Sequence, residues 1–243
     1  MSLRLAVPSK GRLQEATFEW FGARGITLRR TGSGREYAAA ADGVAGLVVE
    51  LLPAGEIARD LAAGRIHLGV TGTDLVCEKI PDPAADVQSL AALGFGHADL
   101  VLAVPVPWVD VATVDDLDDV AARFRRRHGR RLRIATKYHR LVRDFLRVKG
   151  VADYALVDSQ GATEGTIRNR TAEAIADITS TGETLRANRL KILDDGLILQ
   201  SQAELFLSRR AAWGKDAQDA LARLCARLGL DLPKLKGAGA ASS

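Results

Sequence analysis

Asp177-Ile-Thr-Ser-Thr-Gly-Glu-Thr-Leu185 decides the interpretation of this 243-residue chain. The apolar run 174–176 before it predicts a buried strand, and 185–188 after it predicts a short helical turn. The loop between them carries Thr179, Ser180, Thr181, Gly182 and Thr184. Such a loop can direct backbone N–H groups and hydroxyls at one point near a helix N-terminus, and that point suits a phosphate group.

This loop differs from the phosphate loop of the common nucleotide triphosphatases, because it has no lysine. Asp177, at the end of the strand, can hold ribose hydroxyls or a magnesium-bound water. The alternative is a strand, a hydroxyl-rich turn and a helix that bind no ligand. A short motif cannot decide between these two interpretations by itself.

The size and charge of the chain narrow the choice of function. A chain of 243 residues can form one large or two small α/β domains. Its formal net charge is +4, and much of the excess lies in residues 123–131. A mild positive charge suits anionic small molecules as well as nucleic acid. Few aromatic residues accompany the basic ones, which disfavours single-stranded nucleic acid, so we expect no nucleic-acid partner.

The cysteines and the hydropathy indicate an ordinary cytoplasmic protein. Cys77 and Cys225 have no spacing typical of a zinc site or a disulfide framework. The N-terminus does not resemble a signal peptide, and no apolar stretch is long enough to cross a membrane. We therefore expect a cytoplasmic location and no membrane partner.

Strand and helix patterns alternate through most of the chain. Strands are predicted at 3–7, 46–52, 65–70, 99–104, 132–136, 154–157 and 174–176, and most precede a helical pattern. This order predicts an α/β fold with parallel sheets and helices on both faces. Two apolar runs, 190–193 and 197–207, flank Asp194-Asp195-Gly196 and predict a hairpin. A C-terminal helix is predicted within 211–233, followed by a disordered tail at 234–243.

Four further loops carry groups that can bind anions or nucleotides. Lys10 and Arg12 follow the first strand, where α/β proteins usually bind ligands, although both can equally be solvated loop charges. A glycine-rich loop at 31–37 carries Arg35. Residues 71–74 and 159–164 also follow strands and precede helices.

Together these segments resemble the ATP phosphoribosyltransferase family. The matching segments are Pro8-Ser-Lys-Gly-Arg-Leu13, Leu68-Gly-Val-Thr-Gly-Thr-Asp-Leu75, Arg133-Ile-Ala-Thr-Lys-Tyr138, Gly161-Ala-Thr-Glu164 and Asp177-Ile-Thr-Ser-Thr-Gly-Glu-Thr-Leu185. Each segment alone is weak, but all five occur in family order and span residues 3 to about 208.

The resemblance implies a fold and a reaction. The fold would have two lobes like a type II periplasmic binding protein, with the active site in the interlobe cleft. Lobe I would comprise 1–95 and 185–210, and lobe II 96–184. The reaction joins N1 of the adenine of ATP to C1 of the ribose of phosphoribosyl pyrophosphate (PRPP) and releases pyrophosphate. It is the first step of histidine biosynthesis and requires Mg²⁺, which the substrates would carry near Asp177 without a direct protein ligand.

The resemblance also implies roles for individual residues. The PRPP site would comprise Glu164, Asp177, Thr179, Ser180, Thr181, Gly182, Glu183 and Thr184. Lys10, Arg12 and Arg35 would be the catalytic cations that neutralise phosphate oxygens. Gly72, Thr73 and Asp74 would bind ATP together with Lys10 and Arg12. Displacement at an anomeric carbon relies on positioning and charge stabilisation, so no covalent nucleophile is needed.

Two departures from the family pattern change the expectations. About 35 residues follow Ser208, too few for the ACT-type regulatory domain of long-form members. The chain thus resembles the short form, whose catalytic subunit would form a homodimer within a hetero-oligomer. The partner would be a regulatory subunit similar to histidyl-tRNA synthetase that carries the histidine feedback. Many members also have an arginine near Leu52, which is absent here; Arg59, Arg65 or Arg35 would have to substitute.

Two other functions are compatible with parts of the pattern. A non-catalytic two-lobe protein that binds a small solute would share the fold, because fold does not fix function. A nucleobase phosphoribosyltransferase would also use PRPP, but its loop usually follows two adjacent acidic residues. Here a single acid, Asp177, precedes the loop. The choice of ligand distinguishes the three functions.

Overall fold

The computed structural model describes residues 2–30, 38–159 and 162–235 and divides the chain into two compact units. The first unit comprises Met1–Gly96 and Gln202–Ser243, and the second comprises His97–Ser201. The first passage between the units lies close to the predicted position at Phe95. The second lies well beyond the predicted position at Leu185.

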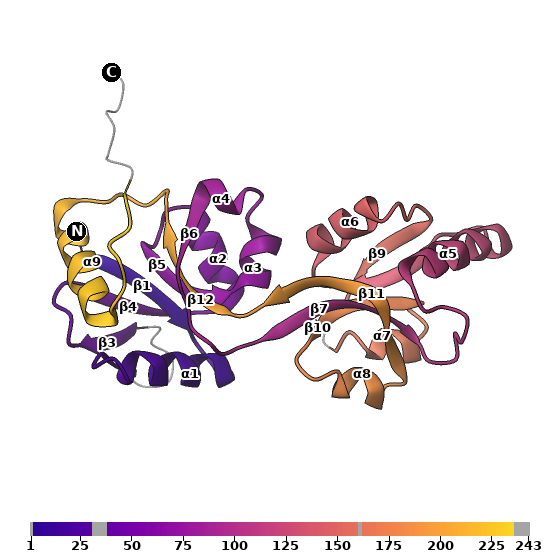
Figure 1. Ribbon diagram of the computed structural model, residues 1–243, viewed down its shortest axis with the longest axis horizontal. Helices are drawn as coiled ribbons and strands as arrows, with labels where there is room; N and C mark the ends of the chain where they lie inside the picture. The colour runs from indigo at the N-terminus through magenta and orange to yellow at the C-terminus, as the bar shows by residue number, and fades with distance from the viewer. Residues whose placement is uncertain (1, 31–37, 160–161, 236–243) are drawn as a thin grey trace, which may run out of the picture. The chain divides into compact units, whose positions relative to one another are not determined.

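The first unit is built on a seven-stranded mixed sheet in the order β2-β3-β4-β1-β5-β12-β6 (Figure 1). The strands are β1 Leu3–Pro8, β2 Thr27–Arg30, β3 Ala38–Asp42, β4 Leu47–Leu52, β5 Leu68–Gly72, β6 Val87–Ala92 and β12 Ala203–Ser208. β1 is parallel to both β4 and β5, whereas the remaining pairs are antiparallel. The predicted parallel arrangement therefore holds only for the three central strands.

Helices cover both faces of this sheet, as the alternation of apolar residues predicts. Leu3, Leu5 and Val7 of β1 pack in one core cluster with α1 (Gly11–Gly22) and α9 (Lys215–Leu228). Ala6 faces the opposite side and packs with α2 (Ala54–Ala62) and α3 (Thr73–Lys79). A short helix, α4 (Pro83–Asp86), precedes β6.

The second unit has a five-stranded mixed sheet in the order β11-β7-β10-β8-β9. The strands are β7 Ala98–Pro105, β8 Leu132–Thr136, β9 Tyr154–Asp158, β10 Ala174–Thr179 and β11 Leu190–Ser201. β10, β8 and β9 are parallel neighbours, and β7 is antiparallel to both β10 and β11. The carboxyl ends of β10, β8 and β9 therefore lie at one edge of the sheet.

Helices lie on both sides of the second sheet (Figure 1). One pair is α5 (Val114–His128) and α6 (His139–Val148), and the other is α7 (Gly165–Arg168) and α8 (Glu183–Ala187). Ile167 of α7 and Leu185 of α8 share a core cluster with Val101 and Ile175. This cluster identifies the sheet face that α7 and α8 cover.

The hairpin predicted around Asp194-Asp195-Gly196 was wrong. β11 runs without reversal from Leu190 to Ser201 and pairs with β7, with register shifts at this point. The Asp195 carboxylate accepts hydrogen bonds from Val114 N (2.8 Å) and Lys149 Nζ (2.7 Å), and the Lys149 bond holds its pKa below the ordinary value. Asp195, whose polarity suggested a turn, is thus hydrogen-bonded to Val114 and Lys149 from other elements. The prediction that lobe I resumes at 185 was also wrong. β11 pairs with β7 and completes the second sheet, so the chain returns to the first unit only at Gln202.

The C-terminal predictions are partly confirmed. A helix is present, but it spans Lys215–Leu228 rather than all of 211–233, and its buried residues include Ala217, Leu221 and Leu224. It belongs to the first unit. Lys234 and Leu235 lie outside any helix, and the rest of the predicted tail, 236–243, lies outside the described residues.

Candidate functional site

The candidate residues of the first unit lie at one edge of its sheet. Lys10 and Arg12 follow the carboxyl end of β1, and Gly72–Asp74 follow that of β5. Because β1 and β5 are adjacent and parallel, both loops occupy the same edge. Ligands of open α/β sheets usually bind outside this edge.

Lys10 and Arg12 are exposed, and neither forms an ion pair with another described residue. Lys10 is the residue before α1, and Gly11 follows with φ 75°. Ser9 N donates to Leu52 O (2.9 Å), which links this loop to the end of β4. The two cations are therefore available to an anionic ligand. Arg35 lies outside the described residues.

The Gly72–Asp74 segment is fixed by β12. Thr73 N donates to Gln202 O (3.0 Å), and Thr73 Oγ1 lies 3.0 Å from Glu204 Oε1. Asp74, in the first turn of α3, is only 6% exposed. The hydroxyl of Thr73 is thus already a donor to protein oxygens, and it is better placed to shape this loop than to donate to a phosphate.

Asp177 lies near the carboxyl end of β10 in the second unit. It pairs with Val101 and therefore lies on the face that α7 and α8 cover. Asp177 Oδ1 accepts from Ile178 N (2.9 Å), and the side chain is half-buried. No hydrogen bond from another described residue is recorded for its second carboxylate oxygen. This oxygen can accept a hydrogen bond from a ligand.

Side chains hold the Thr179–Thr184 loop from within. Thr179 Oγ1 accepts from Gly182 N (2.8 Å), and Gly182 adopts φ 72° immediately before α8. Ser180 Oγ donates to His97 O (2.9 Å). The Ser180 hydroxyl proton therefore anchors the loop. The main chain of Ser180, rather than its hydroxyl donor, is left to face a ligand.

Several donors of this loop have no partner among the described residues. No hydrogen bond is recorded there for the N–H groups of Thr184 and Leu185 or for the hydroxyl of Thr184, and Thr181 and Thr184 are exposed. Arg186 lies beside the loop, since its Nη2 donates to Thr181 O (3.0 Å). Two N–H groups, hydroxyls and a guanidinium on one short segment form a suitable receptor for a phosphate.

Glu164 also belongs to this region. It precedes α7, which covers the same sheet face as α8, and it is half-buried. The neighbouring hydroxyls of Ser159 and Thr163 are buried and lie 2.9 Å apart. They fix the loop that carries Glu164. The predicted PRPP set thus comes from two places in the chain, Glu164 before α7 and the segment 177–184 that runs from the end of β10 into α8.

Sequence reasoning missed three charged groups at these edges. Lys137 follows the carboxyl end of β8, between those of β10 and β9, and Arg186 lies over the Thr179–Thr184 loop. Glu204 comes from β12, far away in the sequence. Lys137 lies in a segment already matched to the family, so its position after a strand was a usable signal. No local pattern indicates Glu204.

The structure also separates the arginines proposed to replace the one missing near Leu52. Arg65 follows α2, at the opposite end of that helix from Leu52, and forms an ion pair with Asp60. Arg59 is exposed on the second turn of α2 and has no ion pair among the described residues. Arg65 is therefore unsuited to the role, and Arg59 is the better placed of the two.

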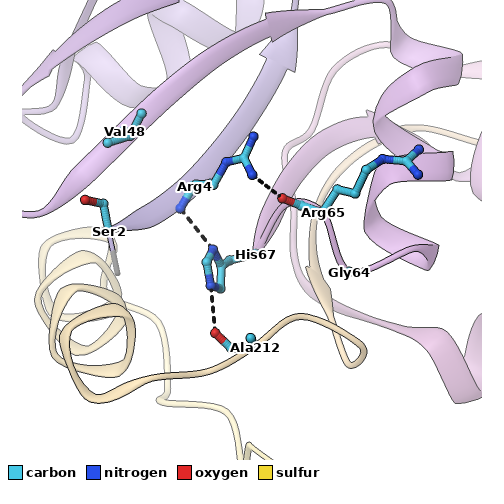
Figure 2. Close-up of a pocket in the computed structure, with 7 residues that line it drawn as sticks. All are labelled: Ser2, Arg4, Val48, Gly64, Arg65, His67 and Ala212. Atoms are coloured by element: carbon cyan, nitrogen blue, oxygen red, sulfur yellow. Dashed lines mark hydrogen bonds between the residues drawn. The ribbon is translucent and has the colours of Figure 1, made fainter.

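A hollow of about 550 Å³ lies at the other end of the first sheet. We call it the His67 hollow, lined by Ser2, Arg4, Val48, Gly64, Arg65, His67 and Ala212 (Figure 2). His67 Nδ1 accepts from Arg4 N (3.1 Å), and Nε2 donates to Ala212 O (3.2 Å). The Arg4 guanidinium binds Glu50 and Arg65 O. The side chains of His67, Arg4 and Arg65 thus already have protein partners, and His67 is structural, as its apolar neighbours in the sequence predict.

The described residues form neither a metal-binding cluster nor a membrane-spanning helix. Across 2–30, 38–159 and 162–235, no three His, Cys, Asp or Glu side chains are grouped to hold a metal ion. Within the same ranges, no helix has the length and hydropathy needed to cross a membrane.

Known proteins resemble this chain over most of its length. The family model described as HisG: ATP phosphoribosyltransferase matches residues 53–229. A Cereibacter sphaeroides protein named ATP phosphoribosyltransferase is 67% identical over 234 residues, which is 96% of this chain and 99% of that protein.

Two solved structures share the fold. The ATP phosphoribosyl transferase (HisG:HisZ) complex from Thermotoga maritima matches with a TM-score of 0.70 at 22% identity, over 93% of this chain and 96% of that one. A histidine kinase sensor domain similar to periplasmic binding proteins matches with a TM-score of 0.51 at 12% identity, over 94% and 89% of the two chains. The two-lobe α/β fold expected from the sequence is thereby confirmed.

Proposed function

The chain belongs to the ATP phosphoribosyltransferase family, whose members are pentosyltransferases of the first step of histidine biosynthesis, and from this premise we propose how its residues perform the reaction. The enzyme transfers the 5-phosphoribosyl group of PRPP to N1 of the adenine of ATP and releases pyrophosphate. The observation that carries the residue assignments is the Thr179–Thr184 loop, whose unpaired donors follow the carboxyl end of β10.

The loop binds the 5′-phosphate of PRPP. The N–H groups of Thr184 and Leu185 and the hydroxyls of Thr181 and Thr184 donate to phosphate oxygens, and Arg186 adds positive charge nearby. Thr179, Gly182 and Ser180 hold the loop in shape through the bonds to Gly182 N and His97 O. Glu183, exposed at the first position of α8, faces solvent beside the phosphate.

Asp177 binds the ribose of PRPP. Its free carboxylate oxygen accepts from a ribose hydroxyl, and its position on the face of α7 and α8 supports this role. Glu164, which precedes α7, is the second carboxylate for these hydroxyls. Two hydrogen bonds to the sugar fix the orientation of C1, and orientation supplies much of the rate in such a displacement.

Residues of the first unit bind ATP and stabilise the leaving pyrophosphate. Lys10 and Arg12 are exposed and free of ion pairs within the described part, so they can neutralise phosphate oxygens. Gly72, Thr73 and Asp74 shape the nucleotide site at the same sheet edge. Arg35 is assigned the same catalytic role from the sequence, and it lies outside the described residues.

The chemistry requires no covalent intermediate. As the bond from C1 to pyrophosphate breaks, positive charge develops on the ribose and negative charge on the leaving group. Asp177 and Glu164 are near the positive charge, whereas Lys10 and Arg12 oppose the negative one. Adenine N1 then forms the new bond to C1 with its own electron pair, and the electrons of the broken bond leave with pyrophosphate.

Magnesium enters with the substrates. Mg²⁺ prefers phosphate oxygens, water and one or two carboxylates, so an ion carried by the substrates beside the ribose would suit the Asp177 carboxylate without a set of protein ligands. When bound, the ion neutralises charge on pyrophosphate. Asp177 is the protein group proposed to meet it or one of its waters.

The proposed assembly is a homodimer within a hetero-oligomer that contains a regulatory subunit. The support is the shared fold with the HisG:HisZ complex and the family membership. That subunit, similar to histidyl-tRNA synthetase, would carry the histidine inhibition. Both substrates are metabolites of the cell interior, so we place the enzyme in the cytoplasm.

The proposal is tested by a turnover assay of the purified chain with ATP, PRPP and Mg²⁺. Formation of phosphoribosyl-ATP is followed by ultraviolet absorbance, with and without the regulatory subunit of the same host. Product in either condition establishes the reaction, and the difference between the two measures the need for the partner. Product from free nucleobases but not from ATP would instead favour a nucleobase phosphoribosyltransferase, and tight binding of a solute without turnover would favour a binding protein.

A further inference from the structure

β9, the last strand of the second sheet, presents an open edge. Among the described strands it pairs with β8 alone, and its register aligns Leu132 with Tyr154 and Thr136 with Asp158. Leu132 N donates to Asp153 O (3.1 Å), and Ser159 N donates to Thr136 O (3.3 Å). Alternate residues of a parallel strand bond to one neighbour, so the N–H and C=O groups of Tyr154, Leu156 and Asp158 point to the open side. No described residue is recorded as their hydrogen-bond partner.

A groove runs along this edge. We call it the β9 groove; it has a volume of about 520 Å³ and is lined by Arg131, His139, Arg143, Arg147, Tyr154 and Leu156, among others. His139, Arg143 and Arg147 recur at intervals of four residues along α6 and therefore share one side of that helix. Tyr154 and Leu156 alternate along β9 and are half-buried. Figure 1 shows α6 next to β9 in the second unit.

The charge of the groove is strongly positive. Arg131 and Arg143 are exposed and form no ion pair with a described residue, and Arg147 has only Asp144 at 3.4 Å. The carboxylate of Asp158 is held by His139 (2.7 Å). Three guanidinium groups thus face one open strand edge with little local compensation. Isolated arginines are common on protein surfaces. Arginines grouped along the unpaired main-chain groups of an edge strand indicate a surface that another strand can join.

We propose that the β9 groove docks an extended acidic segment of a partner polypeptide, which pairs as an added strand with the open edge of β9. Main-chain hydrogen bonds to Tyr154, Leu156 and Asp158 would supply affinity, and alternate carboxylates of the segment would meet Arg131, Arg143 and Arg147. Tyr154 and Leu156 line the groove with the arginines of α6, so their apolar parts would contact the aliphatic stems of those same carboxylate side chains.

Charge decides against a second copy of this chain as the occupant. An antiparallel pairing of β9 with β9 of another copy makes one continuous sheet about a two-fold axis perpendicular to it. That symmetry keeps both copies of α6 on the same face, so Arg143 and Arg147 would face the same arginines. Like charges placed opposite each other oppose such pairing. An acidic partner turns the same groups into attractive ones.

The probe for this proposal is a synthetic peptide of alternating glutamate and valine residues, blocked at both ends and labelled with a fluorophore. Its binding to the full chain is measured by fluorescence anisotropy at low and high salt. Arg143→Glu/Arg147→Glu should weaken binding by about tenfold or more, and added salt should weaken it further. Arg126→Glu, an exposed arginine of α5 outside the groove, is the matched control and should leave the affinity unchanged.

A second peptide tests the strand pairing itself. N-methylation of its two central residues removes one N–H from each edge, so an added strand loses a bond in either orientation. This peptide should bind about tenfold more weakly than its parent. Equal affinity of the two peptides, or of the double variant and the native chain, would overturn the proposal, as would no binding of the parent peptide.

Two further readouts keep this proposal separate from the reaction. ATP and PRPP turnover of the double variant should equal that of the native chain, so failure of the catalytic assignment would not imitate failure of docking. Light scattering measures the mass of both forms without peptide. A dimer that dissociates in the double variant would identify β9 as a contact between copies and refute the acidic occupant.

Discussion

The Thr179–Thr184 loop and the His67 hollow are both polar regions at sheet edges, but they differ in how their hydrogen-bonding groups are used. In the His67 hollow, both ring nitrogens of His67 and the Arg4 guanidinium already have protein partners. In the loop, the N–H groups of Thr184 and Leu185 have none among the described residues. The hollow is a concavity of about 550 Å³ whose main polar groups are paired, whereas the loop retains donors for a ligand.

On the proposed assignment of the loop to phosphate binding, open donors are a better indicator of a binding site than the volume of a cavity. Buried polar groups are normally paired, so a folded chain leaves donors open only where solvent or a ligand completes them. The position of the two regions agrees with this: the loop follows a carboxyl strand end, and the His67 hollow lies at the amino ends of β1, β4 and β5. Changes in the loop should therefore affect catalysis, and changes in the hollow should affect stability.

The largest expected effect comes from removing a loop hydroxyl. Thr184→Val keeps the shape of the side chain but deletes a donor to phosphate, which is worth roughly 1.5–3 kcal/mol for a charged acceptor. The value of kcat/KM for PRPP should fall about 10- to 100-fold, with a smaller change in KM for ATP. Steady-state kinetics with each substrate varied in turn measure this difference. Thr171→Val, an exposed threonine of the same unit, is the control, and equal effects of the two changes would refute the assignment.

A smaller effect is expected from changing the backbone of the loop. Gly182 adopts φ 72°, and a Cβ there would lie 3.0 Å from Arg186 Nη1. Gly182→Ala should lower kcat/KM for PRPP by about tenfold, because the left-handed conformation costs an alanine about 1–2 kcal/mol and the guanidinium must move. Gly129→Ala is a matched control, since Gly129 has φ 67° but nothing within 4 Å of a Cβ. If both variants were less stable but kept the native kcat/KM for PRPP, Gly182 would have only a structural role.

The His67 hollow should respond in stability alone. His67→Ala removes both ring bonds and leaves Arg4 N without its acceptor, at a cost of about 1–3 kcal/mol in the free energy of unfolding. Urea unfolding followed by circular dichroism measures this change, and His128→Ala on the exposed end of α5 is the control. Turnover at saturating ATP and PRPP should stay within about twofold of the native value. A specific rise in KM for either substrate would show that the hollow takes part in binding.

The smallest effect is a pH dependence of stability. Burial lowers the pKa of His67 below its ordinary value, because the imidazolium would lose solvation. Below the ordinary value near 6.5 the unfolded chain therefore binds more protons than the folded chain, and stability falls as the pH falls. The slope for this single proton is at most about 1.4 kcal/mol per pH unit. His67→Asn should flatten the dependence between pH 8 and 5, whereas an unchanged slope would assign it to other groups.

Local sequence patterns predicted the main strands and the loops that follow them. Short apolar segments located β1, β8 and β10, and the residues after those strands located the candidate loops. The same reasoning failed at Asp194-Asp195-Gly196. There the turn-like composition was outweighed by the pairing of β11 with β7 and by the bonds of Asp195 to Val114 and Lys149, which lie far away in the sequence.

The sequence by itself therefore determined the family and much of the strand-and-helix order, because both follow from short segments of the chain; the phosphate chemistry of the Thr179–Thr184 loop is proposed from such a segment. Only the tertiary structure decided which hydrogen-bonding groups are paired within the protein and which remain available. It is the fold that commits the Ser180 hydroxyl to His97, places Glu204 beside Thr73, and leaves the edge of β9 unpaired beside the arginines of α6. Each of these depends on strand order and register, and those are fixed by contacts between distant segments rather than by local composition.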